Sequence, residues 1–182
     1  MRKLLVIAVL MLGSMAFAQD APKPPSNAGE IMDRQFTTLE KEFVPLVEAM
    51  PPDKFEFAPP SGEFKGVRTF ALQARHVATV NYMVASSLLG EKSPIDAKSE
   101  NGPDDLKTKE QVVKYVKDSF AYAHKAIATV NDKNTTEMIE GPFGGKASRL
   151  SLAGILTWHG FDHYGQMVVY LRMNGIVPPA SR

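Results

Sequence analysis

Residues 148–175 read SRLSLAGILTWHGFDHYGQMVVYLRMNG. Apolar residues and two histidines recur here at intervals of three, four and seven, which predicts a helix from about Ser148 to Asn174 with one buried face. Gly175 follows the last periodic residue and Pro178-Pro179 prevents continuation, so the helix should end there. The face expected to be buried consists of Leu152, Leu156, His159, His163, Met167 and Tyr170.

Three more helical segments precede this one. They are expected at about Glu30 to Met50, Val67 to Leu89 and Thr108 to Val130. Pro51-Pro52 and Gly90 are stop signals for the first two, and Thr108 with Gln111 fits a capping box for the third. Strand alternation and internal repeats are lacking. The sequence therefore predicts an all-α four-helix bundle, whose long connections leave its crossover topology open.

The first helix and the loop after it carry expectations about packing. Pro45 lies inside the helix and should kink or shorten its last turn. The loop at 53–66 is rich in proline, glycine and phenylalanine, and we expect its phenylalanines to pin it to the bundle or to wall a pocket. These are Phe55, Phe57 and Phe64, and the inward stripe of the helix is expected to be Ile31, Gln35, Leu39, Phe43 and Leu46.

The first 18 residues have the pattern of a secretory signal peptide. Arg2 and Lys3 form a basic start, residues 4–12 are apolar throughout, and Ala16-Phe17-Ala18 fits a cleavage site before Gln19. The apolar run is short for a membrane span, and an uncleaved anchor is the alternative. We expect export to the periplasm or beyond, and no stable membrane insertion after cleavage. A flexible leader at 19–29 would then precede one helical domain at 30–182.

Composition excludes several classes of function. Cleavage would reduce the 21 basic residues to 19, against 20 acidic ones, for a formal charge of −1. The sequence has no basic patch or charge run, so nucleic acid is not an expected partner. It also has no cysteine, which excludes disulfides, a cysteine nucleophile, a lipoprotein anchor and thiolate metal ligands.

Three of the four histidines suggest a metal site. His159 and His163 stand at i and i+4, which places both rings on one helix face. Buried imidazoles are costly unless their nitrogens find partners, and one divalent ion satisfies both, although bonds to backbone or water are the alternative. His76 lies on the inward face of the second helix and completes a candidate ligand set.

Three neutral imidazoles would leave at least one coordination position open, as in catalytic or exchangeable sites. Zinc is the ion we favour, with nickel, iron or copper as alternatives, because imidazole accepts all four. Calcium and magnesium are disfavoured because the set contains no oxygen ligand.

The segment from His159 to Gln166 and the tail from Tyr170 to Pro179 resemble the DinB-like (YfiT-like) metalloenzyme family. The shared pattern is two histidines, then Gly-Gln, an arginine, a glycine and a Pro-Pro ending. His76, on a helix entered after a loop rich in phenylalanine and proline, is similar to the family's first metal ligand. The resemblance covers nearly all of the sequence after residue 18.

This resemblance implies a four-helix bundle with a three-histidine site for zinc, nickel or a similar divalent ion, and it suggests a homodimer. Some family members are thiol-dependent transferases or isomerases, and many have no assigned reaction. The predicted export fits poorly with a low-molecular-weight thiol cosubstrate, so the resemblance is informative for fold and site and less so for the reaction.

Other polar residues near the histidines have more than one interpretation. Gln166 can orient water or substrate at a metal, or simply close the bundle. Asp162 can hold a ligand imidazole, although its direction along the helix favours solvent. Arg172 can bind an anionic substrate or stabilise the helix C-terminus. His124, on the third helix, is a ligand candidate or a residue at the helix boundary.

Three nearby positions are expected to serve packing. Trp158 should pack rather than recognise a ligand. Gly160 and Gly165 should allow a neighbouring helix to approach, at a cost in helix propensity. Asn81 is close to His76 in sequence but at a poor angle to it.

Three functions remain open. The first is an enzyme, a metal-dependent hydrolase or transferase acting on a small, unidentified molecule, with catalytic residues not assigned. A protease is disfavoured because no glutamate adjoins the histidines. The second is a non-catalytic module that binds a metal or a ligand, and the third is a helical bundle in which the histidines are incidental.

Overall fold

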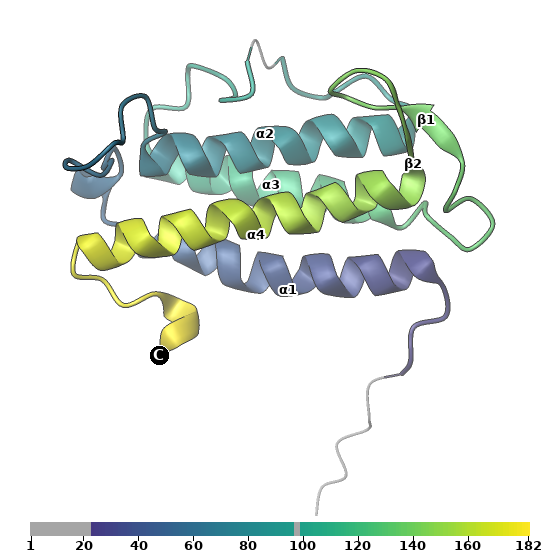
Figure 1. Cartoon of the computed structure of the whole chain (residues 1–182), viewed down its shortest axis with the longest axis horizontal. Helices are drawn as coiled ribbons and strands as arrows, with labels where there is room; N and C mark the ends of the chain where they lie inside the picture. The colour runs from purple at the N-terminus through teal and green to yellow at the C-terminus, as the bar shows by residue number, and fades with distance from the viewer. Residues whose placement is uncertain (1–22, 97–98) are drawn as a thin grey trace, which may run out of the picture.

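The computed structural model describes residues 23–96 and 99–182, and four α-helices form the body of this part (Figure 1). They are α1 (Ala28–Ala49), α2 (Phe70–Leu89), α3 (Lys109–Ile127) and α4 (Arg149–Met173). The predicted all-α four-helix bundle is confirmed. The predicted signal peptide lies outside the described residues. None of the helices in the described part is both long and apolar enough to cross a membrane.

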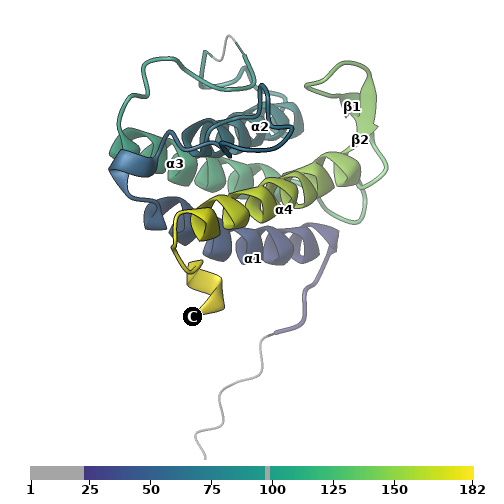
Figure 2. The same ribbon diagram turned by 60° about the vertical axis from the view of Figure 1, so that its left-hand side comes forward.

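The order of the helices around the bundle shows the crossover topology that the sequence left open (Figures 1 and 2). α2 packs against α3 and α4, and α1 packs against the same two helices from the opposite side. The connection between α2 and α3 returns along the bundle, so these two helices run parallel, whereas α4 runs antiparallel to both. This crossover places α2 directly beside α4, the two helices that carry the candidate ligands.

Local signals set the helix ends. Thr108 accepts from the Gln111 backbone N–H, and the Gln111 side chain accepts from the Thr108 N–H at 2.9 Å, so the predicted capping box is confirmed. Gly90 ends α2 with φ 68°, a left-handed conformation that suits glycine. α1 begins at Ala28, inside the predicted leader, because the side chain of Asn27 accepts from the Glu30 N–H at 3.0 Å.

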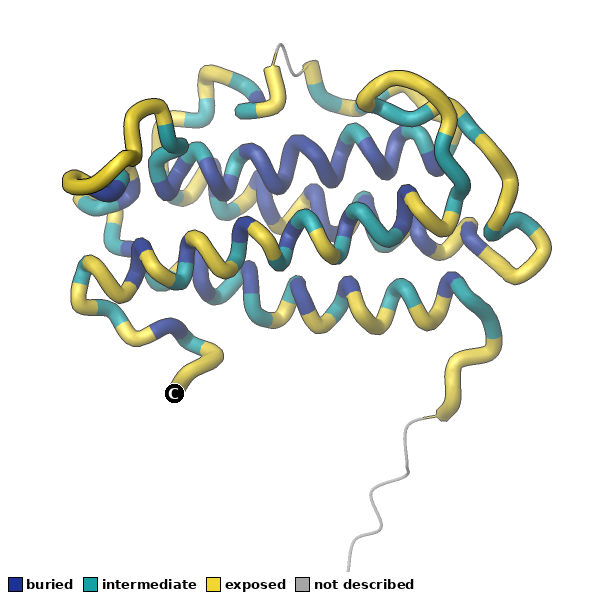
Figure 3. The backbone as a smooth tube through the Cα atoms, in the orientation of Figure 1, coloured by how far each residue is buried: buried dark blue, intermediate teal, exposed yellow. Residues whose placement is uncertain are grey.

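The core lies where the four helices face one another, with exposed residues on the outside (Figure 3). In α1 the buried side chains begin at Phe36, after the buried Gly29, and the expected inward positions Ile31 and Gln35 are exposed. Pro45 does not end the helix, which continues to Ala49. α2 is buried almost all round, as expected for a helix covered by α3, by α4 and by the connection that follows it.

The connections between helices differ in how firmly they pack. Phe55 lies edge-on to Phe70 at 5.6 Å and Phe57 edge-on to Tyr170 at 5.7 Å, as predicted, but Phe64 is 46% exposed and does not pin its loop. The connection before α4 contains an antiparallel hairpin of β1 (Met138–Glu140) and β2 (Lys146–Ser148). Sequence reasoning missed these strands because three residues are too few to show alternation.

Candidate metal centre

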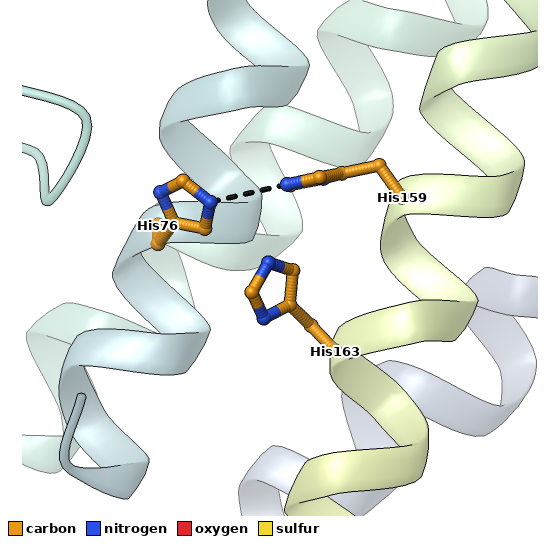
Figure 4. Close-up of side chains that lie close together, drawn as sticks. All are labelled: His76, His159 and His163. Atoms are coloured by element: carbon orange, nitrogen blue, oxygen red, sulfur yellow. Dashed lines mark hydrogen bonds between the residues drawn. The ribbon is translucent and has the colours of Figure 1, made fainter. Parts of the chain in front are cut away.

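The structure brings together the three histidines that the sequence singled out. His76 projects from α2, and His159 and His163 project from successive turns of α4, so that the three rings enter one space between the helices (Figure 4). One ring nitrogen from each lies within 4.8 Å of the other two. Within the described residues this is the one group of three histidine or acidic side chains found close enough to share a metal ion.

The surroundings keep these rings neutral. Burial, with the neighbouring rings of His163 and His76, lowers the pKa of His159 to about 3. Burial, with smaller contributions from His76 and Arg68, lowers the pKa of His163 to about 4. The pKa of His76 is also lowered, again chiefly by burial. Neutral imidazole is the form that offers a lone pair to a metal, so the set is ready for one at neutral pH.

A backbone contact orients His76. Its Nδ1 lies 2.8 Å from the carbonyl oxygen of Glu100, and because a carbonyl only accepts, Nδ1 carries the proton. Nε2 of His76 is then a bare lone pair, and it faces Nε2 of His159 at 3.1 Å. The Glu100 carbonyl is held in place by its own loop, in which Arg75 of α2 donates to the Pro103 carbonyl at 2.5 Å.

A chain of side-chain amides orients His163. The Asp162 carboxylate can only accept, so the amide group of Gln166 donates to it at 3.2 Å. The Gln166 oxygen then accepts from the Gln73 amide at 2.9 Å, and the Gln73 oxygen accepts from Nδ1 of His163. Because the carboxylate fixes which atom donates in each of these hydrogen bonds, Nδ1 of His163 carries the proton and Nε2 keeps a bare lone pair. Such contacts to the second nitrogen are typical of metal-binding histidines.

The donor set fits a divalent metal ion. His76 and His163 each have one nitrogen occupied by a hydrogen bond and present the other toward their neighbours. His159 shares one hydrogen bond through Nε2, and its Nδ1 is buried with no partner among the described residues. The one proton shared between His76 and His159 leaves other ring nitrogens without a partner within the described ranges. A metal ion can accept a lone pair from each of the three rings at once.

A cavity of about 400 Å³ opens beside the centre, and both His76 and His159 line it. Its other walls include Phe143 at the tip of the hairpin, Trp158 and Ile155 of α4, and Glu100. Trp158 is 61% exposed, so the expectation that it serves packing is wrong.

Sequence reasoning missed three residues of this site. Gln73 stands one turn before His76 on α2, where a glutamine in a largely apolar helix was a usable signal, and the structure leaves it only 2% exposed. Glu100 and Phe143 come from connections, where periodicity says nothing about contacts. Gln166 and Asp162 are both exposed, yet both belong to the series of hydrogen bonds that leads through Gln73 to His163.

The remaining candidates lie elsewhere. His124 is not at the centre, because its Nδ1 lies 2.5 Å from Asp33 and its Nε2 3.2 Å from Glu40, in a contact between α3 and α1. Asn81 is fully buried and donates to Ser119 at 3.3 Å, which agrees with its poor angle to His76. Arg172 is exposed and donates to Ser181.

The two helical glycines differ. An added Cβ at Gly160 would overlap the Leu39 side chain of α1, so this glycine does allow close approach, as predicted. At Gly165 an added Cβ would meet no atom of the described chain within 4 Å, so the same prediction is wrong there.

Comparison with known proteins places this bundle in a family. The sequence model of the DinB superfamily matches residues 35–167. Among solved structures, the chain is similar to a DinB-like protein from Bacillus cereus ATCC 10987, with a TM-score of 0.62 and 19% sequence identity, over 81% of this chain and 93% of that one. At that identity the similarity supports the fold. No curated protein was found to match the sequence.

Proposed function

The chain belongs to the DinB superfamily, and on that premise we propose that it is an exported metalloprotein that acts as a metal-dependent hydrolase or transferase on a small molecule. His76, His159 and His163 would hold one divalent ion. The observation that carries the proposal is the convergence of three neutral imidazoles, two of them buried and that of His159 partly buried, beside a cavity. A divalent ion held by three imidazoles keeps positions free for other ligands and supplies Lewis acidity.

The residues of the chain supply positioning, shielding and a proton acceptor. The amide chain from Asp162 fixes the ring of His163, and the Glu100 carbonyl fixes the ring of His76. Glu100 also lines the cavity, and its carboxylate lies 4.0 Å from Nδ1 of His76, the ring nitrogen that faces away from the other two histidines. Because it is the one carboxylate-bearing residue among those that line this cavity, we propose Glu100 as the general base, a role that the sequence did not identify.

Zinc is the ion we propose, with nickel, iron or copper as alternatives. The three ligand positions are all nitrogen, and imidazole binds each of these ions. No carboxylate belongs to the group of three in the described part of the chain, which disfavours calcium and magnesium.

Elemental analysis of the untagged protein tests the site. The wild type should contain about one equivalent of a divalent metal, and His159→Ala and His163→Ala should each lose most of it while remaining helical by circular dichroism. His124→Gln is the matched control, because it changes the one histidine outside the centre and should keep the metal. Full occupancy in His163→Ala would contradict the assignment, and no metal in the wild type, even after titration, would leave a bundle with incidental histidines.

Catalysis and export need their own tests. Metal-loaded wild type and Glu100→Gln should be compared on small esters, amides and group-transfer substrates. Turnover that the variant loses while keeping its metal supports the enzyme, and metal binding without turnover supports a binding module. Export is inferred from residues 1–18 alone, and the intact mass of protein recovered outside the cytoplasm should correspond to a chain beginning at Gln19.

A further inference from the structure

We infer that the cavity beside the three histidines is a subsite for a flat apolar group, so that the substrate is a small molecule in which a metal-binding head carries an aromatic or similarly flat apolar body. This inference rests on the proposed function. It concerns the part of the substrate that does not touch the metal.

The first support is the composition of the cavity wall. Phe143, Trp158 and Ile155 give it an apolar surface, and a volume of about 400 Å³ lies in the range of small-molecule sites. Two of its three charge-capable groups are the rings of His76 and His159, which are neutral and belong to the centre. The wall therefore favours a body without charge, next to a head that reaches the histidines.

The second support is the exposure of the two aromatic rings. Trp158 is 61% exposed and Phe143 is 52% exposed, although both sit beside a buried polar centre. Large aromatic side chains left open at the rim of a cavity are typical of ligand-binding surfaces. A bound aromatic ring would cover the exposed part of both side chains.

The third support is the way the chain holds Phe143 in position. The hairpin of β1 and β2 carries it at its tip, where Gly144 and Gly145 have φ of 89° and 72°. The turn is closed by a hydrogen bond from the Gly141 N–H to the Gly145 carbonyl at 2.8 Å. Left-handed glycines fix a tight turn, so Phe143 is presented at the cavity by a defined loop.

Glu100 adds one polar contact to the subsite. This residue lines the cavity, and its carboxylate lies 3.8 Å from Arg68, whose side chain also donates to Asn101 at 2.7 Å. These contacts hold the loop against the entry to α2. A substrate with an N–H or O–H near its head can donate to this carboxylate, whereas a second negative group there would be repelled.

Two hydroxamates that share a metal-binding head test the subsite. Acetohydroxamate carries a methyl group and benzohydroxamate carries a phenyl ring. Their dissociation constants are to be measured by calorimetry on zinc-loaded protein, and Trp158, the single tryptophan of the sequence, provides a fluorescence signal for the wild type. We expect benzohydroxamate to bind about tenfold more tightly, because burying a phenyl ring against open aromatic walls stabilises the complex.

Substitutions test whether Phe143 and Trp158 cause the preference for benzohydroxamate. Phe143→Ala and Trp158→Ala should each reduce the tenfold ratio by at least half, and the double variant should bring it close to one, while acetohydroxamate affinity stays constant. Phe64→Ala is the matched control, since Phe64 is similarly exposed, at 46%, but does not line the cavity. Its ratio should equal that of the wild type.

The outcomes separate the inference from the proposed function. Protein that binds zinc and binds both hydroxamates equally, or that keeps its preference in the double variant, overturns the subsite and leaves the metal site standing. Protein that takes up no zinc overturns the proposed function itself, and the subsite with it.

Discussion

The three histidines are held by different kinds of partner. A backbone carbonyl fixes His76, a chain of amides ending in a carboxylate fixes His163, and in the described part of the chain His159 is hydrogen-bonded to His76 alone. A ring held through its second nitrogen cannot rotate away from the centre, so two of the three ligands are preorganised. Preorganisation reduces the conformational entropy lost on binding, which raises metal affinity without adding a ligand.

Gln73→Leu tests the amide chain, because leucine has a similar size but cannot accept from His163. We expect zinc affinity to fall by about 10- to 100-fold, with the dissociation constant measured by competition with a chromophoric chelator. Gln35→Leu, an exposed glutamine of α1, should leave affinity unchanged. Equal affinities for the two variants would show that the chain from Asp162 to His163 has no influence on the metal.

The neutral histidines predict a pH dependence of stability in the metal-free protein. The ordinary pKa of 6.5 applies to the unfolded chain, whereas the folded values are about 4 for His163 and about 3 for His159. Between pH 6.5 and about 4 the unfolded chain therefore binds more protons, so stability is full above pH 6.5 and is lost as pH falls below it. We expect the Tm to drop by roughly 10 °C over this window.

Thermal unfolding followed by circular dichroism checks this dependence. The double variant His159→Gln/His163→Gln lacks both groups and should show a much flatter profile, so the difference between the two curves isolates the histidines from the carboxylates. Parallel curves for the two proteins would mean that these rings bind protons equally in the folded and unfolded states, so that folding does not lower their pKa.

At the level of elements, one glycine determines how closely α4 lies on α1. Gly160→Ala would drive a methyl group into Leu39, whose side chain is fully buried and would have to shift. We expect a loss of about 1–3 kcal/mol in the free energy of unfolding, measured in urea. Gly165→Ala meets nothing within the described chain and should instead stabilise α4 by up to about 1 kcal/mol. If both substitutions changed the free energy of unfolding in the same direction, the two glycines would not differ in their packing as described.

The elements that could be predicted are those whose signals are local. The capping box at Thr108 and the stop at Gly90 determine helix ends within a few residues, and the spacing of His159 and His163 determines their shared face. The hairpin, the carbonyl of Glu100 and the position of Phe143 depend on contacts between distant segments. No periodicity encodes these contacts, so the sequence pointed to three histidines that the structure brings together but not to the cavity wall beside them.

At the scale of the molecule, the centre joins two helices that the chain order separates. His76 and His159 are 83 residues apart, and they meet because the crossover brings α4 against α2. The centre therefore connects the second helix to the last one, across the interface on which the bundle depends. An ion bound there would stabilise the folded state as a whole, because the unfolded chain cannot hold the three rings together.

This linkage predicts that metal and stability change together. With free zinc at about 100 times its dissociation constant, the folded state should gain about 2.7 kcal/mol, which raises the Tm by roughly 5–10 °C for a chain of this size. His163→Ala should unfold at the same temperature with and without zinc, whereas His124→Gln should keep the full increase. An equal increase in His163→Ala would mean that zinc stabilises some other part of the molecule. A wild-type increase that disappears on chelation and returns on adding zinc would tie the stability of the bundle to the three histidines between α2 and α4.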